Sequence, residues 1–445
     1  MKDSILKNKK AAILTLGCKV NQYESDAMGG LLKQAGCRMV DFQEKADIYI
    51  VNTCSVTNIA DRKSRQMLHR ARKNNPQAVI VAAGCYVQAD PAHAMEDAAV
   101  DLALGNNLKY NIVEILEEYF ISRRHLPVQN CMDLSKPVDY EPLCIGNAGS
   151  VSNTRAYVKV QDGCNQFCSY CIIPYTRGRI RSRLPEDVLA EVRELAQGGC
   201  REIVLTGIHL ASYGMDKKDN TGGKEGLLAL ASAVSEVEGI CRVRLGSLEP
   251  GIITEEFLEG LKNNSKFCPH FHLSLQSACD ETLKRMNRKY TIEEYAEKCS
   301  LVRRYFDNPA ITTDVIVGFP GETEEEFRIT VENLEKLNLY EMHVFKFSPR
   351  KNTVAYGLPG QVPEPVKSKR SEALMEMARR HQACYEELFQ GQSVEVLVEE
   401  MIELAGRRYA SGHTANYIKV LFPSEEDLGN QLVQVCYGRH YSKQI

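Results

Sequence analysis

The first part of the chain alternates short apolar runs with longer polar stretches of helical character. The apolar runs between residue 11 and about residue 120 are AAILTLG, DIYIVNT, AVIVAAG and DLALG. This alternation is typical of β-α units whose strands form a parallel sheet covered by helices. The pattern therefore predicts an α/β domain with an open parallel sheet over residues 1–124.

A stretch without periodicity follows. Residues 125–152 (HLPVQNCMDLSKPVDYEPLCIGNAGSVS) contain Pro, Gly, Ser and Asn but no repeating apolar positions. This composition predicts a linker between two domains.

The alternation then resumes over a longer region. Six strand-like runs occur, namely AYVKV, EIVLTG, RVRLGS, HFHLSL, TTDVIVGF and EMHVFKF. Polar segments with helical periodicity separate them, for example 185–197, 254–262, 292–305 and 323–337, and a further helix is expected at about 365–389. Six β-α units predict a partial (β/α)6 barrel over residues 153–389, with an open doubly wound sheet as the alternative.

The last segment changes character. The runs VEVLVEE, RRYASGH, YIKVLF and LVQVCY are short, alternate in polarity and are separated by breaks that include Gly. This pattern predicts a small antiparallel β-barrel over residues 390–445.

Composition limits the classes of protein that fit. The net charge of the 445-residue chain is −3, so any surface for nucleic acid must be local. No apolar stretch approaches the ~18 residues that a membrane-spanning helix needs, which predicts a cytoplasmic protein with no membrane partner. In a reducing compartment, the sixteen cysteines are expected to ligate metal or to be buried rather than to form disulfides.

One group of cysteines is local in sequence. Cys164, Cys168 and Cys171 form a C-x3-C-x2-C loop directly after a predicted strand. Three thiolates would ligate three irons of a [4Fe–4S] cluster and leave the fourth open to the amine and carboxylate of S-adenosylmethionine (SAM). The spacing, and the aromatic Tyr170 before the last Cys, are typical of radical SAM enzymes. The alternative is a zinc site, but no fourth Cys or His lies nearby.

A second group is dispersed. Cys18, Cys54 and Cys85 each lie just past a predicted strand. Because the carboxyl ends of parallel strands meet at one edge of a sheet, these three thiols are expected to converge. They would then bind an auxiliary [4Fe–4S] cluster, again with one open iron that could hold sulfur. The alternative is three independent core cysteines.

Several motifs resemble those of the radical SAM methylthiotransferases. They are LGCKVNQYES (16–25), VNTCSVT (51–57), AAGC (82–85) and GCNQFCSYCIIPYTRGRIRSR (163–183). The resemblance covers nearly the whole chain and implies an auxiliary-cluster domain, a radical SAM domain and a C-terminal TRAM domain. It further implies contacts to SAM or substrate from Tyr170, Thr206, Gly207, Ser247, Glu249, Gln276 and Asp314.

The segment GCKVNQYES most resembles the branch that methylthiolates C2 of N6-threonylcarbamoyladenosine at position 37 of tRNA. The resemblance implies a 5′-deoxyadenosyl radical from one SAM, sulfur from the auxiliary cluster and a methyl group from a second SAM. It also implies tRNA, a flavodoxin- or ferredoxin-like electron donor and a sulfur source as partners. The alternatives are isopentenyladenosine in tRNA or a ribosomal-protein aspartate as the substrate, or a non-catalytic iron–sulfur protein that binds RNA or senses redox state.

Two basic segments are candidates for anion or RNA binding. Six basic residues, Arg62, Lys63, Arg65, Arg70, Arg72 and Lys73, follow Cys54 on a predicted helix, and a plain solvated helix surface fits equally well. Arg177, Arg179, Arg181 and Arg183 alternate, and in an extended segment they would share one side as four unpaired guanidiniums.

The C-terminal segment gives a weaker signal. Residues 391–445 hold five basic and seven acidic residues, so the segment as a whole is no obvious RNA clamp. Five of its side chains could form a local basic and aromatic patch, namely Arg407, Arg408, Tyr409, His413 and Tyr417.

Overall fold

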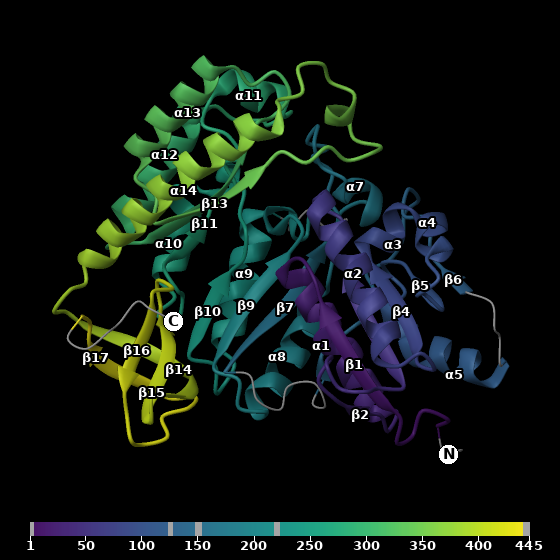
Figure 1. The fold of residues 1–445 in the computed structure, drawn as a ribbon. Coiled ribbons are helices and arrows are strands. Elements are labelled where there is room, and N and C mark those ends of the chain that lie inside the picture. The colour runs from purple at the N-terminus through teal and green to yellow at the C-terminus, as the bar shows by residue number, and fades with distance from the viewer. Residues whose placement is uncertain (1–3, 123–127, 147–153, 218–222, 439–445) are drawn as a thin grey trace.

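The N-terminal region is a six-stranded parallel sheet with helices on both faces (Figure 1). The computed structural model describes residues 4–122, 128–146, 154–217 and 223–438. The sheet order is β2-β1-β3-β4-β5-β6. Its strands are β1 (Lys10–Thr15), β2 (Arg38–Met39), β3 (Ile48–Thr53), β4 (Val79–Gly84), β5 (Leu102–Leu104) and β6 (Val128–Asn130). The predicted parallel α/β sheet is confirmed.

Two of these strands were not expected from the sequence. β2 is two residues long, and β6 lies in the segment that was predicted to be a linker and pairs with β5. Both are edge strands too short to show a period-2 pattern. The domain boundaries themselves stay predictions.

Alternation of side chains along the strands gives the sheet two apolar faces. One face packs on α1 (Lys19–Gln34) and α5 (Ile112–Ser122). The other packs on α2 (Asn58–Asn74), α3 (Cys85–Ala89) and α4 (Pro91–Glu96). Between β5 and α5 lies the 3-10 turn η1 (Lys109–Asn111).

The central region is a partial barrel of six parallel strands. In order they are β7 (Arg155–Asp162), β9 (Glu202–Gly207), β10 (Arg242–Leu245), β11 (His270–His272), β12 (Ala310–Val317) and β13 (Glu341–Lys346). Isolated parallel bridges between Val243 and Phe267 and between Leu248 and Leu273 connect β10 to β11. The short β8 (Arg181–Ser182) pairs antiparallel with β7. All six predicted strands are present, and the partial barrel is confirmed.

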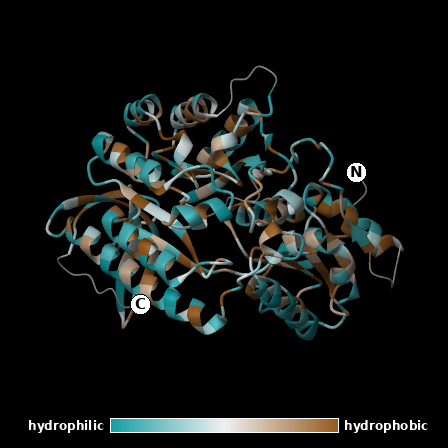
Figure 2. Ribbon diagram, turned by 90° about the horizontal axis from the view of Figure 1, so that it is seen from above, coloured by the Kyte–Doolittle hydropathy of each residue, from teal (hydrophilic) through white to brown (hydrophobic). Residues whose placement is uncertain are grey.

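Helices cover the outside of this barrel, with their polar faces outward (Figure 2). The longer ones are α8 (Pro185–Gln197), α9 (Lys224–Ser235), α10 (Glu255–Lys262), α12 (Ile292–Tyr305), α13 (Glu324–Leu337) and α14 (Glu364–Glu387). Thr291 and Thr323 begin α12 and α13 with capping boxes, which explains why their predicted boundaries agree with the structure. The short helical turns are α7 (Ile173–Thr176), α11 (Asp280–Arg285), η2 (Leu210–Ser212), η3 (Pro250–Ile252) and η4 (Val354–Tyr356).

The C-terminal region is a curled antiparallel sheet in the order β16-β15-β14-β17. Its strands are β14 (Ser393–Leu404), β15 (Arg407–Thr414), β16 (Lys419–Pro423) and β17 (Leu432–Cys436). Its apolar face packs against Ala310 and Tyr340 at the amino ends of the barrel strands β12 and β13. Within the described ranges, no helix is long and apolar enough to cross a membrane.

Candidate functional site

Both parallel sheets direct the carboxyl ends of their strands toward one cavity of ≈ 530 Å³. Five of the six predicted cluster cysteines line it, namely Cys18, Cys54, Cys164, Cys168 and Cys171. The sixth, Cys85, is buried behind them. The two cysteine groups, far apart in the sequence, therefore face the same space.

The dispersed cysteines lie together, as the strand-end argument predicted. Cys18 is the N-cap of α1, Cys54 follows β3, and Cys85 is the first residue of α3. Gly17 has a φ of 104°, and a Cβ placed there would be 2.9 Å from the Cys54 Sγ. Only glycine permits this approach. The thiol of Cys85 acts electrostatically on those of Cys18 and Cys54. Their role as cluster ligands stays a prediction.

The environment of the thiols suits metal ligation. Burial raises the pKa of Cys54 and of Cys171 to about 12, so metal binding would have to displace their protons. Hydrogen-bond donors lie close to the sulfur atoms of three other cysteines. Arg288 Nη1 lies 3.3 Å from Cys168 Sγ, the backbone N–H of Gln166 3.4 Å from Cys164 Sγ, and Asn106 Nδ2 3.5 Å from Cys85 Sγ. Such donors stabilise thiolates that bind iron.

Four of the seven residues expected to contact SAM or substrate line the cavity: Tyr170, Glu249, Gln276 and Asp314. Thr206, Gly207 and Ser247 lie outside its lining. Gln276 has a φ of 74°, an unusual backbone conformation for a residue with a side chain. Residues held in this way are concentrated at binding and active sites.

Sequence reasoning missed Arg288, which is central to this wall of the cavity. Its Nη2 donates to both carboxylate oxygens of Glu249, at 2.8 and 2.7 Å, while Nη1 reaches Cys168. His209 lies on the other side of Glu249, and burial lowers the pKa of this imidazole. No local motif surrounds Arg288, so the sequence alone offers no signal for it.

The Arg288→Gln variant is expected to lower the midpoint potential of a [4Fe–4S] cluster reconstituted at Cys164, Cys168 and Cys171 by on the order of 60 mV, a tenfold change in a one-electron equilibrium. The reduced cluster carries more negative charge, and the variant removes a cation and a donor from Cys168. Redox titration followed by electron paramagnetic resonance measures the change. In the matched control, Arg285→Gln, the lost ion pair is with Glu326 and the potential should stay constant. An unchanged potential in Arg288→Gln would contradict the assignment.

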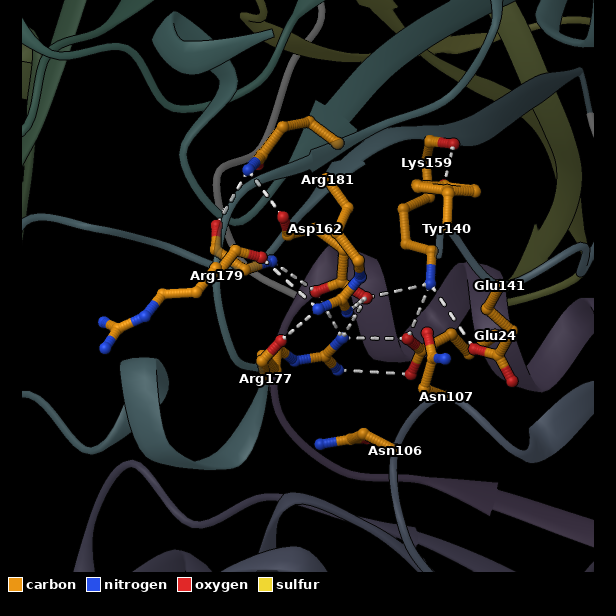
Figure 3. A network of polar contacts seen from close by, with 12 residues as sticks. Glu24, Asn106, Asn107, Tyr140, Glu141, Lys159, Asp162, Arg177, Arg179 and Arg181 are labelled. Carbon is orange, nitrogen blue, oxygen red and sulfur yellow. Dashed lines mark hydrogen bonds and ion pairs between the residues drawn. The ribbon is translucent and has the colours of Figure 1, made fainter. Parts of the chain in front are cut away.

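A buried ionic network joins helix α1 of the N-terminal region to strand β7 of the barrel (Figure 3). Arg177 donates to Glu24 Oε1 at 2.8 Å, to Asp162 Oδ1 at 3.2 Å and to Asn21 Oδ1 at 2.7 Å. The cations of the network are Lys109, Lys159, Arg177 and Arg181, and its carboxylates are Glu24, Glu141 and Asp162. Four cations therefore surround three carboxylates, all of them in the interior.

The expectation that four alternating arginines are unpaired is wrong for three of them. Arg177 and Arg181 belong to the network, and Arg183 pairs with Glu191. All three are buried, whereas Arg179 is exposed and stacks over Phe167 at 4.5 Å. The segment is not extended throughout, because Arg177 caps α7 and only Arg181–Ser182 forms a strand.

The basic segment after Cys54 is the helix α2, whose N-terminal residues Thr57 and Ala60 line the cavity. Arg62 and Lys63 are exposed, Arg65 is half-buried, and Arg72 pairs with Asp101. The C-terminal patch expected from the sequence is divided. Arg407 and Arg408 are exposed, but His413 and Tyr417 stack on each other against the barrel.

Comparisons with known proteins agree with this architecture. The chain matches the Radical SAM superfamily over residues 158–334 and the uncharacterized protein family UPF0004 over residues 10–105. It is 40% identical to the threonylcarbamoyladenosine tRNA methylthiotransferase MtaB of Bacillus subtilis, over 95% of this chain and 92% of that protein. It is 36% identical to the tRNA-2-methylthio-N(6)-dimethylallyladenosine synthase of Moorella thermoacetica, over 97% and 96%.

Among solved structures, the radical SAM methyltransferase TsrM of Kitasatospora setae is similar in fold. The TM-score is 0.55 over 78% of this chain and 77% of that one. With 15% identity, this likeness concerns the fold alone.

Proposed function

Because the chain belongs to the radical SAM methylthiotransferase family, we propose that it methylthiolates C2 of N6-threonylcarbamoyladenosine at position 37 of tRNA. The resemblance of GCKVNQYES to that branch and the similarity to proteins named MtaB support this substrate. The single observation that carries the proposal is that five of the six cysteines line one cavity, with the sixth, Cys85, buried close to Cys18 and Cys54.

The residues present fit two iron–sulfur clusters and SAM. When bound, these groups would supply the radical, the sulfur and the methyl group, which side chains cannot provide. Cys164, Cys168 and Cys171 would hold one cluster, and Cys18, Cys54 and Cys85 the auxiliary one. Beside Cys168, Arg288 positions Glu249 through two hydrogen bonds, and Tyr170 packs edge-on against Phe319, which fixes the Tyr170 ring at the cavity wall.

The buried network gives further support to an auxiliary cluster. A cluster held by three thiolates carries net negative charge, and the network contains one more cation than carboxylates. Burial disfavours the charged form of Arg177, but Glu24 and then Cys85 raise the pKa of this guanidinium well above its usual value. A cationic region next to the three thiols offsets the cost of burying an anionic cluster.

Mass spectrometry of tRNA nucleosides tests the proposed activity. Reconstituted protein, SAM, a reductant and a sulfide source are incubated with tRNA that carries threonylcarbamoyladenosine, with an isopentenyladenosine tRNA as the comparison. The methylthio product is expected from the first tRNA only. A product from the isopentenyladenosine tRNA alone would overturn the substrate assignment but keep the family. We further propose an electron donor of the flavodoxin or ferredoxin type.

The exposed face of α2 is expected to contact RNA phosphates, because it begins at the cavity. The double variant Arg62→Ala/Lys63→Ala should weaken tRNA binding and reduce the slope of log K against log salt by about 1–2. Fluorescence anisotropy at several salt concentrations measures this slope. The control, Arg328→Ala/Lys336→Ala, lies on α13 of the barrel. Equal slopes in both double variants would favour a plain solvated surface for α2.

A further inference from the structure

A lysine beside the auxiliary cysteines reaches the barrel strand β7 and forms no ion pair with the residues that the structure describes. Lys19 directly follows Cys18 as the first residue of α1 and is exposed. Among the described residues it makes no hydrogen bond and no ion pair. Lys19 Nζ lies 5.9 Å from the centroid of the Tyr157 ring on β7. By contrast, the two buried lysines Lys109 and Lys159 both have carboxylate partners.

The contact with Tyr157 shows that the Lys19 ammonium lies over the inner face of strands β7, β9 and β10. Tyr157, Val204 and Arg244 occupy one register row across β7, β9 and β10, so their side chains share a face. The next row on the same face, two residues earlier along each strand, holds Arg155 and Glu202.

The cations of this region are only partly satisfied by hydrogen bonds. Arg155 pairs with Glu202 at 2.7 Å and with Glu399 at 2.6 Å, and Arg244 shares Glu202 through Nε at 2.9 Å. The carboxylate of Asp314, which lines the cavity, also acts on Lys19, so three cations, counting Lys19, face three carboxylates. Arg244 is 1% exposed, yet neither its Nη1 nor its Nη2 has a hydrogen-bond partner in the described part of the chain. Its guanidinium lies 4.7 Å from the Tyr417 ring, which covers it.

We propose that Lys19 is a specificity residue that binds the carboxylate of the N6 substituent of the nucleoside, with Arg155 and Arg244 supplying a positive field behind it. This inference rests on the proposed function. A base that enters the cavity leaves the stack while its backbone stays outside. An anionic group on the base can therefore reach the barrel interior, whereas backbone phosphates stay near the mouth.

The same lysine would discriminate against an apolar substituent. The relatives are named for two N6 groups, of which threonylcarbamoyl ends in a carboxylate and dimethylallyl is a hydrocarbon. An apolar group seated on Lys19 would remove water from an unpaired ammonium and return no hydrogen bond, which is costly. Selectivity would then come from repulsion of the wrong group as well as attraction of the right one.

Equilibrium binding of short anticodon stem-loop RNAs tests the proposal. One RNA carries threonylcarbamoyladenosine as the free acid, and the other carries its methyl ester. Wild-type protein should bind the acid about 10- to 100-fold more tightly, the range of one charge-assisted hydrogen bond. In Lys19→Ala this ratio should fall to near 1, with ester binding unchanged. The matched control is Lys33→Ala in the last turn of the same helix, which should keep the wild-type ratio.

Two outcomes would overturn the proposal: equal binding of acid and ester by wild-type protein, or a wild-type ratio in Lys19→Ala. Product analysis in the same samples separates this from the proposed function. If one of these binding outcomes is found and wild-type protein still forms the methylthio product, only the carboxylate site is wrong. If wild-type protein binds the acid more tightly than the ester but forms no product, the carboxylate site is supported and the proposed activity is contradicted.

Discussion

The Cys54→Ala variant is expected to lose methylthiolation to background while it still cleaves SAM to 5′-deoxyadenosine. Cys54 is buried at the carboxyl end of β3, next to Gly17 and facing the cavity. With two of three thiols left, the auxiliary cluster should be lost, and iron should fall from about eight to about four atoms per chain. The cluster at Cys164, Cys168 and Cys171 is separate and should continue to support SAM cleavage.

Iron and sulfide analysis, together with chromatography of both products, measures these effects in one preparation. The matched control is Cys37→Ala, since this cysteine is also buried but its thiol donates to the Leu6 carbonyl at 3.5 Å and does not line the cavity. It should retain about eight irons and full activity. A Cys54→Ala protein that still holds eight irons would show that this thiol is not a ligand.

The Arg177→Met variant is expected to destabilise the fold by about 3–5 kcal/mol, the range for removing one partner of a buried ion pair. Arg177 is fully buried and donates to Asn21, Glu24 and Asp162. Without it these acceptors lose a donor that water cannot replace. Urea denaturation followed by circular dichroism measures the change.

The exposed neighbour Arg179 provides the control for this experiment. Arg179→Met should change the free energy of unfolding by no more than about 0.5 kcal/mol, as surface substitutions generally do. The two substitutions are identical in chemistry and two positions apart, so only burial and pairing differ. Equal effects of the two would mean that the ionic network contributes little to stability.

The strand-end cysteines show why part of the site was predictable from sequence. Cys18, Cys54 and Cys85 each follow an apolar run that becomes a strand, and a parallel sheet brings such ends to one edge. Local periodicity therefore sufficed to place residues up to 67 positions apart near one another. The helices of the barrel were equally accessible, because Thr residues and Pro mark their starts.

The charged side chains show where sequence reasoning stops. Arg177 was expected to be unpaired, yet its partner Glu24 is 153 positions away. Arg288 is 120 positions from the cysteine it contacts. The first pair depends on how the N-terminal sheet packs against the barrel, and the second on how distant loops of the barrel come together. Neither periodicity nor spacing contains that information.

The ionic network has a consequence for how a reaction here must proceed. Glu24 lies on the N-terminal sheet's helix α1, Asp162 ends the barrel strand β7, and Arg177 binds both. The two cysteine groups are therefore joined through one buried ionic network, and separating them would leave charges unpaired in the protein interior. We expect their spacing to stay constant through turnover. Under the proposed function, delivery of the nucleotide by the RNA, rather than closure of the protein, would then align the reacting atoms.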